Sequence, residues 1–172
     1  MILLIFLIIV CGVVLFWFLG RKPVLFKNIL LSNITKFLKI LLFRGYDRGF
    51  LVISVQKDRK PKRFIQIAKY IEDKNKTGLR LAFPHAEWSQ PYFNKLKDRL
   101  IKEKIKFEIE TTESKEVPEF IVVDILQDLN FAIRLINLIL TKVFNVSEIE
   151  PLELYMINIS PDEEIIGNIH QK

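Results

Sequence analysis

The first twenty residues of the chain, 1–20, carry no charged side chain and are followed directly by Arg21 and Lys22. At a rise of about 1.5 Å per residue, a helix of this length is about 30 Å long, which matches the hydrocarbon core of a bilayer. The sequence therefore predicts a transmembrane anchor over residues 1–20, which places the rest of the chain beside a membrane.

A cleaved secretory signal is the main alternative for this segment. Such signals begin with a basic region and end at a site of small residues. The chain has neither feature here, and Phe16, Trp17 and Phe18 form an aromatic cluster of the kind found where a helix meets lipid headgroups. These features favour an uncleaved anchor.

The charges that flank the predicted anchor set its expected orientation, because lysine and arginine near a span favour the cytoplasmic side. Only the α-amino group precedes the span, whereas five basic residues follow it: Arg21, Lys22, Lys27, Lys36 and Lys39. We therefore expect a single-pass membrane protein with its N-terminus outside and its domain in the cytoplasm. Four N-x-S/T sequons matter only in a glycosylating compartment and are otherwise ordinary turn residues: Asn33, Asn75, Asn145 and Asn158.

Charge is distributed unevenly along the chain, whose formal net charge is +6. Residues 21–66 hold 12 lysines and arginines against 2 acidic residues, whereas residues 110–172 hold 4 against 12. A basic region beside a span suits the anionic lipids of a cytoplasmic leaflet, so membrane lipids are its expected partner. Nucleic acid attracts the same charges and is an unlikely partner.

The segment that follows the predicted anchor, residues 21–48, is expected to be a basic juxtamembrane helix and linker. Within it, lysine, asparagine and serine interrupt the apolar run 24–43 too often for a second span. This pattern favours a helix that lies in the lipid interface. The alternative is a first helix that packs on the domain.

Beyond residue 49, short apolar runs alternate with segments of helical periodicity. We expect strands over residues 50–55, 79–83, 106–111, 119–125 and 152–159, and helices over 62–73, 89–104 and 127–144. Strands separated by helices predict a small α/β domain over residues 49–160, with a mixed, partly parallel sheet and flanking helices. Strands 106–111 and 119–125 are expected to pair as an antiparallel hairpin or to lie at neighbouring positions in the sheet. Residues 161–172 are expected to form a flexible acidic tail.

Two loops are the candidate sites, because ligands of open α/β sheets gather at the carboxyl ends of parallel strands. The first loop follows strand 50–55 and carries five basic residues that suit an anion or a lipid phosphate: Lys57, Arg59, Lys60, Lys62 and Arg63. It has no glycine that lets the backbone wrap a phosphate, which excludes a nucleotide-hydrolysing loop of the G-x-x-x-x-G-K-[ST] type.

The second loop, after strand 79–83, holds the candidate catalytic residues. His85 and Glu87 can act as an acid–base pair and Ser89 as a nucleophile if the fold brings them within hydrogen-bond reach. Structural roles account for them better: Ser89 caps a helix, Glu87 favours the helix N-terminus, and His85 is an ordinary loop residue.

A metal centre or a bound cofactor is not expected. The single cysteine, Cys11, lies in the predicted span, and the second histidine, His170, lies in the tail. Asp124 and Asp128 at a strand end are the only candidates for a divalent cation.

These observations favour a membrane-anchored binding protein that presents a non-catalytic α/β domain to a protein partner at the cytoplasmic face. In architecture the chain resembles small single-pass proteins of bacterial competition and defence systems, and this resemblance implies an immunity or adaptor role. The acidic distal part suits a basic partner. The alternatives are an enzyme that acts on a phosphorylated or lipid-linked substrate, and a membrane-tethered nucleic-acid binder.

Overall fold

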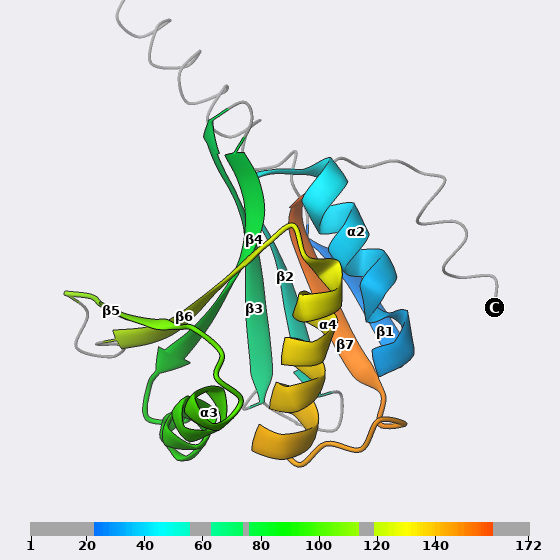
Figure 1. Ribbon diagram of the computed structural model, residues 1–172. Coiled ribbons are helices and arrows are strands. Elements are labelled where there is room, and N and C mark those ends of the chain that lie inside the picture. Colours follow the sequence, from blue (N-terminus) through cyan, green and yellow to red (C-terminus); the bar gives the residue numbers. More distant parts are fainter. Residues whose placement is uncertain (1–22, 56–62, 74–75, 114–118, 160–172) are drawn as a thin grey trace, which may run out of the picture.

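The computed structural model describes residues 23–55, 63–73, 76–113 and 119–159, which form a two-layer domain of one sheet and helices (Figure 1). The sheet has seven strands in the order β1-β7-β2-β3-β4-β6-β5. The strands are β1 (Val24–Ile29), β2 (Gly45–Val55), β3 (Phe64–Asp73), β4 (Lys76–His85), β5 (Glu108–Thr111), β6 (Glu119–Leu126) and β7 (Leu152–Ile159).

The helices of the described chain all lie on one face of this sheet (Figure 1). They are α2 (Ile34–Arg44), which follows the short 3-10 turn η1 (Leu31–Asn33), α3 (Gln90–Lys102) and α4 (Leu129–Leu138), which continues into the π-helical turn η2 (Ile139–Val143). The α4–η2 segment lies between α2 and α3 and contacts both. This central position explains why the sequence of residues 127–144 is apolar around most of its circumference.

The prediction of a partly parallel sheet is wrong, because every pair of neighbouring strands is antiparallel. The strands before and after α2, β1 and β2, do run in the same direction, but β7 lies between them. In the same way β6 lies between β4 and β5, the strands before and after α3. Each of these two strand–helix–strand units is therefore split by an antiparallel strand from elsewhere in the chain.

The prediction of a helix over residues 62–73 is also wrong, because Phe64–Asp73 form the central strand β3. The predicted helical face combined Phe64 and Ala68 with Ile67. In the sheet, Ile67 points toward the helices and is fully buried, whereas Phe64 and Ala68 point to the other face and are half-buried. A strand with apolar residues on both faces lacks strict alternation, and its apolar positions can imitate a helical spacing.

Residues 24–43 do not form one interfacial helix. They form β1, η1 and α2, and α2 packs six buried side chains against the sheet, including Phe37, Leu38 and Leu41. The alternative of a helix packed on the domain is therefore the observed arrangement. The end of the expected linker, residues 45–48, is the start of β2, which has a register irregularity between Gly45 and Phe50.

Among the residues that the structure describes, none of the helices has both the length and the apolar character needed to cross a membrane. The predicted anchor, 1–20, and the predicted tail, 161–172, lie outside the described residues. The finding contradicts the predicted transmembrane architecture and the predicted single-pass membrane location, and we do not retain them.

The core lies between the helices and the sheet face that they cover. Alternate residues of the strands supply one side of it, and the inward faces of the helices supply the other. The largest fully buried side chains include Phe37 of α2, Phe83 of β4, and Ile65 and Ile67 of β3. The core therefore takes up only one of the two sheet faces.

One charged side chain, Lys69 of β3, is buried at the margin of this core with 7 % of its surface exposed. Its ammonium donates a hydrogen bond to the Gly45 carbonyl oxygen at 2.7 Å. Burial lowers the pKa of Lys69 below its usual value of 10.5, and the nearby Asp47 carboxylate partly offsets this effect.

This lowered pKa predicts how stability depends on pH. Between the lowered pKa and 10.5, the unfolded chain binds more protons at residue 69 than the folded chain does, so stability rises with pH in this window. We expect the free energy of unfolding of the wild type, minus that of Lys69→Met, to increase from pH 8 to about pH 10.5. Urea unfolding at several pH values measures this difference, and a constant or falling difference would contradict the prediction.

Candidate functional site

Ser89, the predicted nucleophile, has a structural role in the loop after β4. Ser89 is fully buried, and its hydroxyl donates to the Pro84 carbonyl oxygen at 2.6 Å and accepts from the Ala86 N–H at 2.8 Å. It stands at the N-cap position of α3 but makes no side-chain bond to the helix. The hydroxyl therefore closes the turn between β4 and α3 and is not presented to a substrate.

Ser89→Ala is expected to destabilise the chain by about 1–2 kcal/mol, because the buried Ala86 N–H and the Pro84 carbonyl lose their partner. Urea unfolding measures the loss. Ser32→Ala is the matched control, since Ser32 is exposed and should change stability by less than about 0.5 kcal/mol. Equal effects of the two substitutions would refute the structural role of Ser89.

His85 pairs with Glu119 and not with Glu87, its predicted partner. His85 Nδ1 lies 3.1 Å from Glu119 Oε1, directly across the β4–β6 pair, and the imidazole stacks on Phe93 with ring centroids 4.3 Å apart. Glu87 is exposed in the loop. The structure therefore joins His85 to Glu119 and Ser89 to the backbone, and the predicted trio does not form one catalytic group.

Of the predicted basic loop, Lys57, Arg59, Lys60 and Lys62 lie outside the described residues. Arg63 is described, and its guanidinium donates to the Phe144 carbonyl oxygen at 3.3 Å. Next to it, Phe64 stacks on Trp88 with ring centroids 4.6 Å apart, so the start of β3 meets the loop that follows β4. Phe64 at the start of β3 and Trp88 in the loop after β4 thus lie at the same end of the sheet.

Asp124 and Asp128, the candidate ligands of a divalent cation, make separate structural contacts. Asp124 accepts a hydrogen bond from Arg80 at 2.8 Å, whereas Asp128 caps α4 by accepting the Phe131 N–H at 2.8 Å. No group of three or more metal-ligating side chains occurs within the described parts of the chain.

The most prominent feature outside the predicted sites is the sheet face turned away from the helices, which we call the open face. No helix of the described chain covers it (Figure 1). The strand registers place these side chains on it: Phe50, Val52, Gln66, Ala68, Tyr70, Arg80, Ala82, Val122, Asp124, Tyr155 and Ile157. A water-facing sheet surface is usually polar, whereas most of these side chains are apolar or aromatic.

Arg80 of β4 is the main cation near the centre of the open face. Its guanidinium bonds to Asp124, lies 3.7 Å from the Glu110 carboxylate, and stands 5.3 Å from the centre of the Tyr70 ring. The hydrogen bond to Asp124 raises the pKa of Arg80, so the guanidinium stays charged. Burial raises the pKa of Tyr70, with further contributions from Asp124 and Glu72, so its phenol stays neutral.

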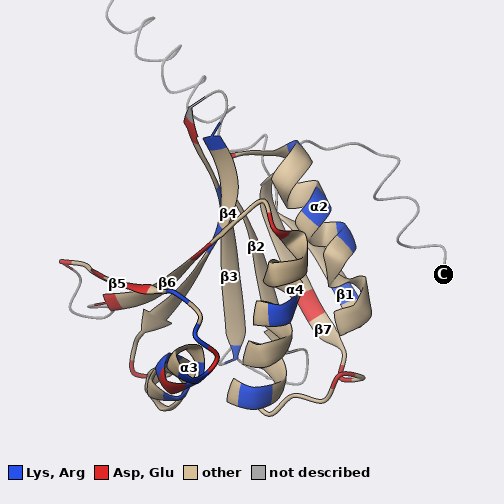
Figure 2. Cartoon of the chain, in the orientation of Figure 1, with Lys and Arg blue, Asp and Glu red and all other residues tan. Residues whose placement is uncertain are grey.

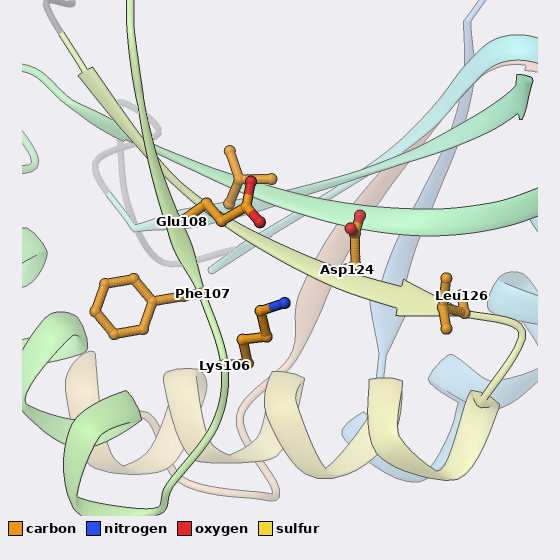
Figure 3. A pocket seen from close by; sticks show the side chains of 6 residues that line it. Lys106, Phe107, Glu108, Asp124 and Leu126 are labelled. Atoms are coloured by element: carbon orange, nitrogen blue, oxygen red, sulfur yellow. The ribbon is translucent and has the colours of Figure 1, made fainter.

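A pocket of about 280 Å³ opens at the β5–β6 end of the open face (Figure 3). It is lined by Lys106, Phe107, Glu108, Val122, Asp124 and Leu126. It forms because β5 pairs with β6 only from Glu108 opposite Val122 onward, which leaves the outer edge of β6 beyond Val122 without a strand beside it in the described chain. Figure 3 shows Glu108 and Asp124 pointing away from α4, on the open side.

Acidic side chains gather around this pocket. Figure 2 shows Asp and Glu concentrated on the β5–β6 hairpin, which carries Glu108, Glu110, Glu119 and Asp124. Arg80 and Lys106 are the nearby cations. Part of the acidic region expected over residues 110–172 therefore lies at one end of the open face, whereas Glu153 lies on β7 and Asp128 caps α4.

Sequence reasoning missed the open face because it placed β3 in a helix. With residues 64–71 in a strand, Phe64, Gln66, Ala68 and Tyr70 share one side and join the outward residues of β2. A signal for the open face was present in the sequence: Phe50 and Val52 make β2 apolar on both faces. A strand of that kind needs cover on two sides.

No protein-family model matches the chain, and neither a curated protein nor a solved structure is significantly similar to it.

Proposed function

We propose that the chain is a non-catalytic binding protein that takes a protein partner on the open face of its sheet. The observation that carries this proposal is the apolar and aromatic character of a sheet face that no helix of the described chain covers. Tyrosine, phenylalanine and arginine are enriched where proteins bind one another, and Tyr155, Phe50 and Arg80 stand on this face.

The pocket at the β5–β6 end suggests the chemistry of the partner. The carboxylates of Glu108 and Asp124 line the pocket together with the apolar side chain of Val122. A lysine or arginine of the partner suits this arrangement, because its aliphatic stem can contact the apolar lining while its charge meets the carboxylates. The partner therefore presents an apolar surface with a basic side chain at one end, as suits an adaptor or immunity role.

An enzymatic function has less support. The Ser89 hydroxyl is committed to the turn, and the His85–Glu119 pair has no nucleophile beside it among the described residues. The pocket holds carboxylates and an ammonium, but one carboxylate, Asp124, is already bonded to Arg80.

A site-specific cross-link in cells that naturally make the chain tests the binding proposal. Tyr155 is replaced by the photoreactive residue benzoylphenylalanine, and the same replacement at Ile101, an exposed residue of α3, is the matched control. We expect a discrete adduct with another protein from position 155 and none from position 101. Val52→Glu and Glu108→Lys should each reduce the adduct at least tenfold, because they alter the centre of the open face and the pocket.

Two results would refute the proposal. One is an adduct yield at position 155 no higher than at position 101. The other is an adduct that persists unchanged in both Val52→Glu and Glu108→Lys, provided that the urea midpoints of these variants show that they are folded.

A further inference from the structure

The outer side of α2 carries an exposed surface that neither the core nor the open face uses. A groove of about 220 Å³ lies there, and its lining includes Lys36, Lys39, Ile40 and Phe43. Phe43 is a large aromatic residue, yet it is 72 % exposed. We call this surface the α2 groove, and it combines an exposed ring with two lysines.

The two lysines of the α2 groove have no acidic partner in the described chain. Within the described residues, no carboxylate lies within ion-pair distance of Lys36 or Lys39, whereas Lys76 has one at 2.7 Å. An occupant of the α2 groove should therefore supply a carboxylate, together with an apolar side chain that covers Phe43.

The pocket at the β5–β6 end of the open face has both of these features. No cation lies within ion-pair distance of its Glu108 carboxylate among the residues that the structure describes. Leu126, which also lines the pocket, is 59 % exposed. Figure 2 shows the contrast between the two surfaces, with Lys and Arg along α2 and with Asp and Glu on the hairpin of β5 and β6. The α2 groove and the pocket are therefore complementary in charge, and each exposes an apolar side chain.

The spacing of these side chains also matches. Along α2, Lys36 lies about 10 Å before Phe43. Along β6, Val122, which pairs with Glu108, lies about 13 Å before Leu126. The two spacings differ by about 3 Å, which the flexible side chain of Lys36 can span. One helix laid along β6 can therefore make the apolar contact and the ionic contact together.

The α2 helix of the same chain cannot make these contacts. Its buried side chains, among them Phe37, Leu38 and Leu41, hold it on the core beside β2 and β7. The pocket lies at the other end of the sheet, beyond β3 and β4 (Figure 1). The complementary surfaces can therefore meet only when they belong to two chains.

We infer that the α2 groove of one copy binds the pocket of a second copy, with Lys36 at Glu108 and with Phe43 against Leu126. The contact joins two different surfaces, so an assembly keeps a free pocket at one end and a free α2 groove at the other, and copies can add head to tail. The partner proposed above and a second copy both use the pocket. The inference therefore adds a competitor to the proposed function, but it does not depend on that function.

A photo-cross-link between two differently tagged full-length copies, made in the same cell, tests the inference. The first copy carries benzoylphenylalanine in place of Phe43, which keeps an aromatic ring at this position. The matched control has the same replacement at Ile149, which is even more exposed, at 81 %. We expect an adduct with both tags from position 43, at a yield at least tenfold above that from position 149. The cross-link should map to residues 106–108 or 122–126 of the second copy.

A charge swap then identifies the contact. Lys36→Glu in the first copy should reduce the adduct at least fivefold, and Glu108→Lys in the second copy should do the same, because each change brings like charges together. The two changes combined should restore most of the yield, because opposite charges face each other again. Lys102→Glu in the first copy, at an exposed position of α3, is the matched control and should leave the yield unchanged.

Four results would overturn the inference. They are equal yields from positions 43 and 149, a cross-link that stays within one chain, a cross-link that maps to α2 of the second copy, and no recovery in the combined variant. The cross-link from Tyr155 reports on the proposed function separately. If position 155 captures another protein while position 43 captures no second copy, this inference fails and the proposed function stands.

Discussion

Replacing Phe83 by alanine is expected to lower the free energy of unfolding by about 3–5 kcal/mol. Phe83 of β4 is fully buried, and its ring lies 6.4 Å from that of Trp88 and 6.0 Å from that of Phe144. It therefore links the sheet to the loop before α3 and to the end of η2. Alanine would leave a cavity that the antiparallel strands around it can only partly fill. Urea unfolding followed by circular dichroism measures the loss.

Phe50→Ala is the matched control, because it removes the same side chain from the opposite face. Phe50 lies on the open face and is half-buried, so its loss should cost about 1–2 kcal/mol. A loss for Phe50→Ala as large as that for Phe83→Ala would show that both faces of the sheet are core. That result would contradict the open face and the function proposed for it.

Replacing Gly45 by valine is expected to destabilise the chain by about 2–3 kcal/mol. Gly45 joins α2 to β2, and its N–H donates to the Leu41 carbonyl oxygen, which ends the helix. A Cβ atom at this position collides with that same oxygen, and a backbone atom cannot move aside as a side chain can. The collision must push α2 away from β2, and Lys69, which donates to the Gly45 carbonyl, loses its alignment as well.

Lys97→Val on the exposed side of α3 controls for the insertion of a β-branched residue. It should cost no more than about 1 kcal/mol, because only helix propensity changes there. Thermal and urea unfolding of the two variants measure the contrast. If Gly45→Val proved as mild as Lys97→Val, the close approach of α2 and β2 would have to be abandoned.

Local patterns in the sequence predicted several elements well. Strand 152–159 and the hairpin of β5 and β6 are confirmed, and so is the helix that starts after Ser89. In that helix Phe93, Leu96 and Leu100 are buried at helical spacing, whereas Ile101 is 59 % exposed. These elements are determined by neighbouring residues, such as the proline in the first turn of α3, and such signals are visible without the fold.

The strand order was not predictable in the same way. A strand, a helix and a strand in succession indicate that the two strands run in parallel, and β1 and β2 follow this rule. No local feature of the sequence predicts that β7 lies between them. The candidate site failed for the same reason. His85 is paired with Glu119, 34 positions away, rather than with its near neighbour Glu87.

The insertion of β7 between β1 and β2 has a consequence for how the chain acquires its structure. Val24 pairs with Met156, so β1, the first described strand, gains its neighbour in the sheet only when β7, the last described strand, is in place. Contacts between such distant positions slow folding, because a long loop must close before the contacts form. During synthesis on the ribosome, the meander of β2, β3 and β4 can assemble early, whereas β1 stays unpaired until β7 has been synthesised.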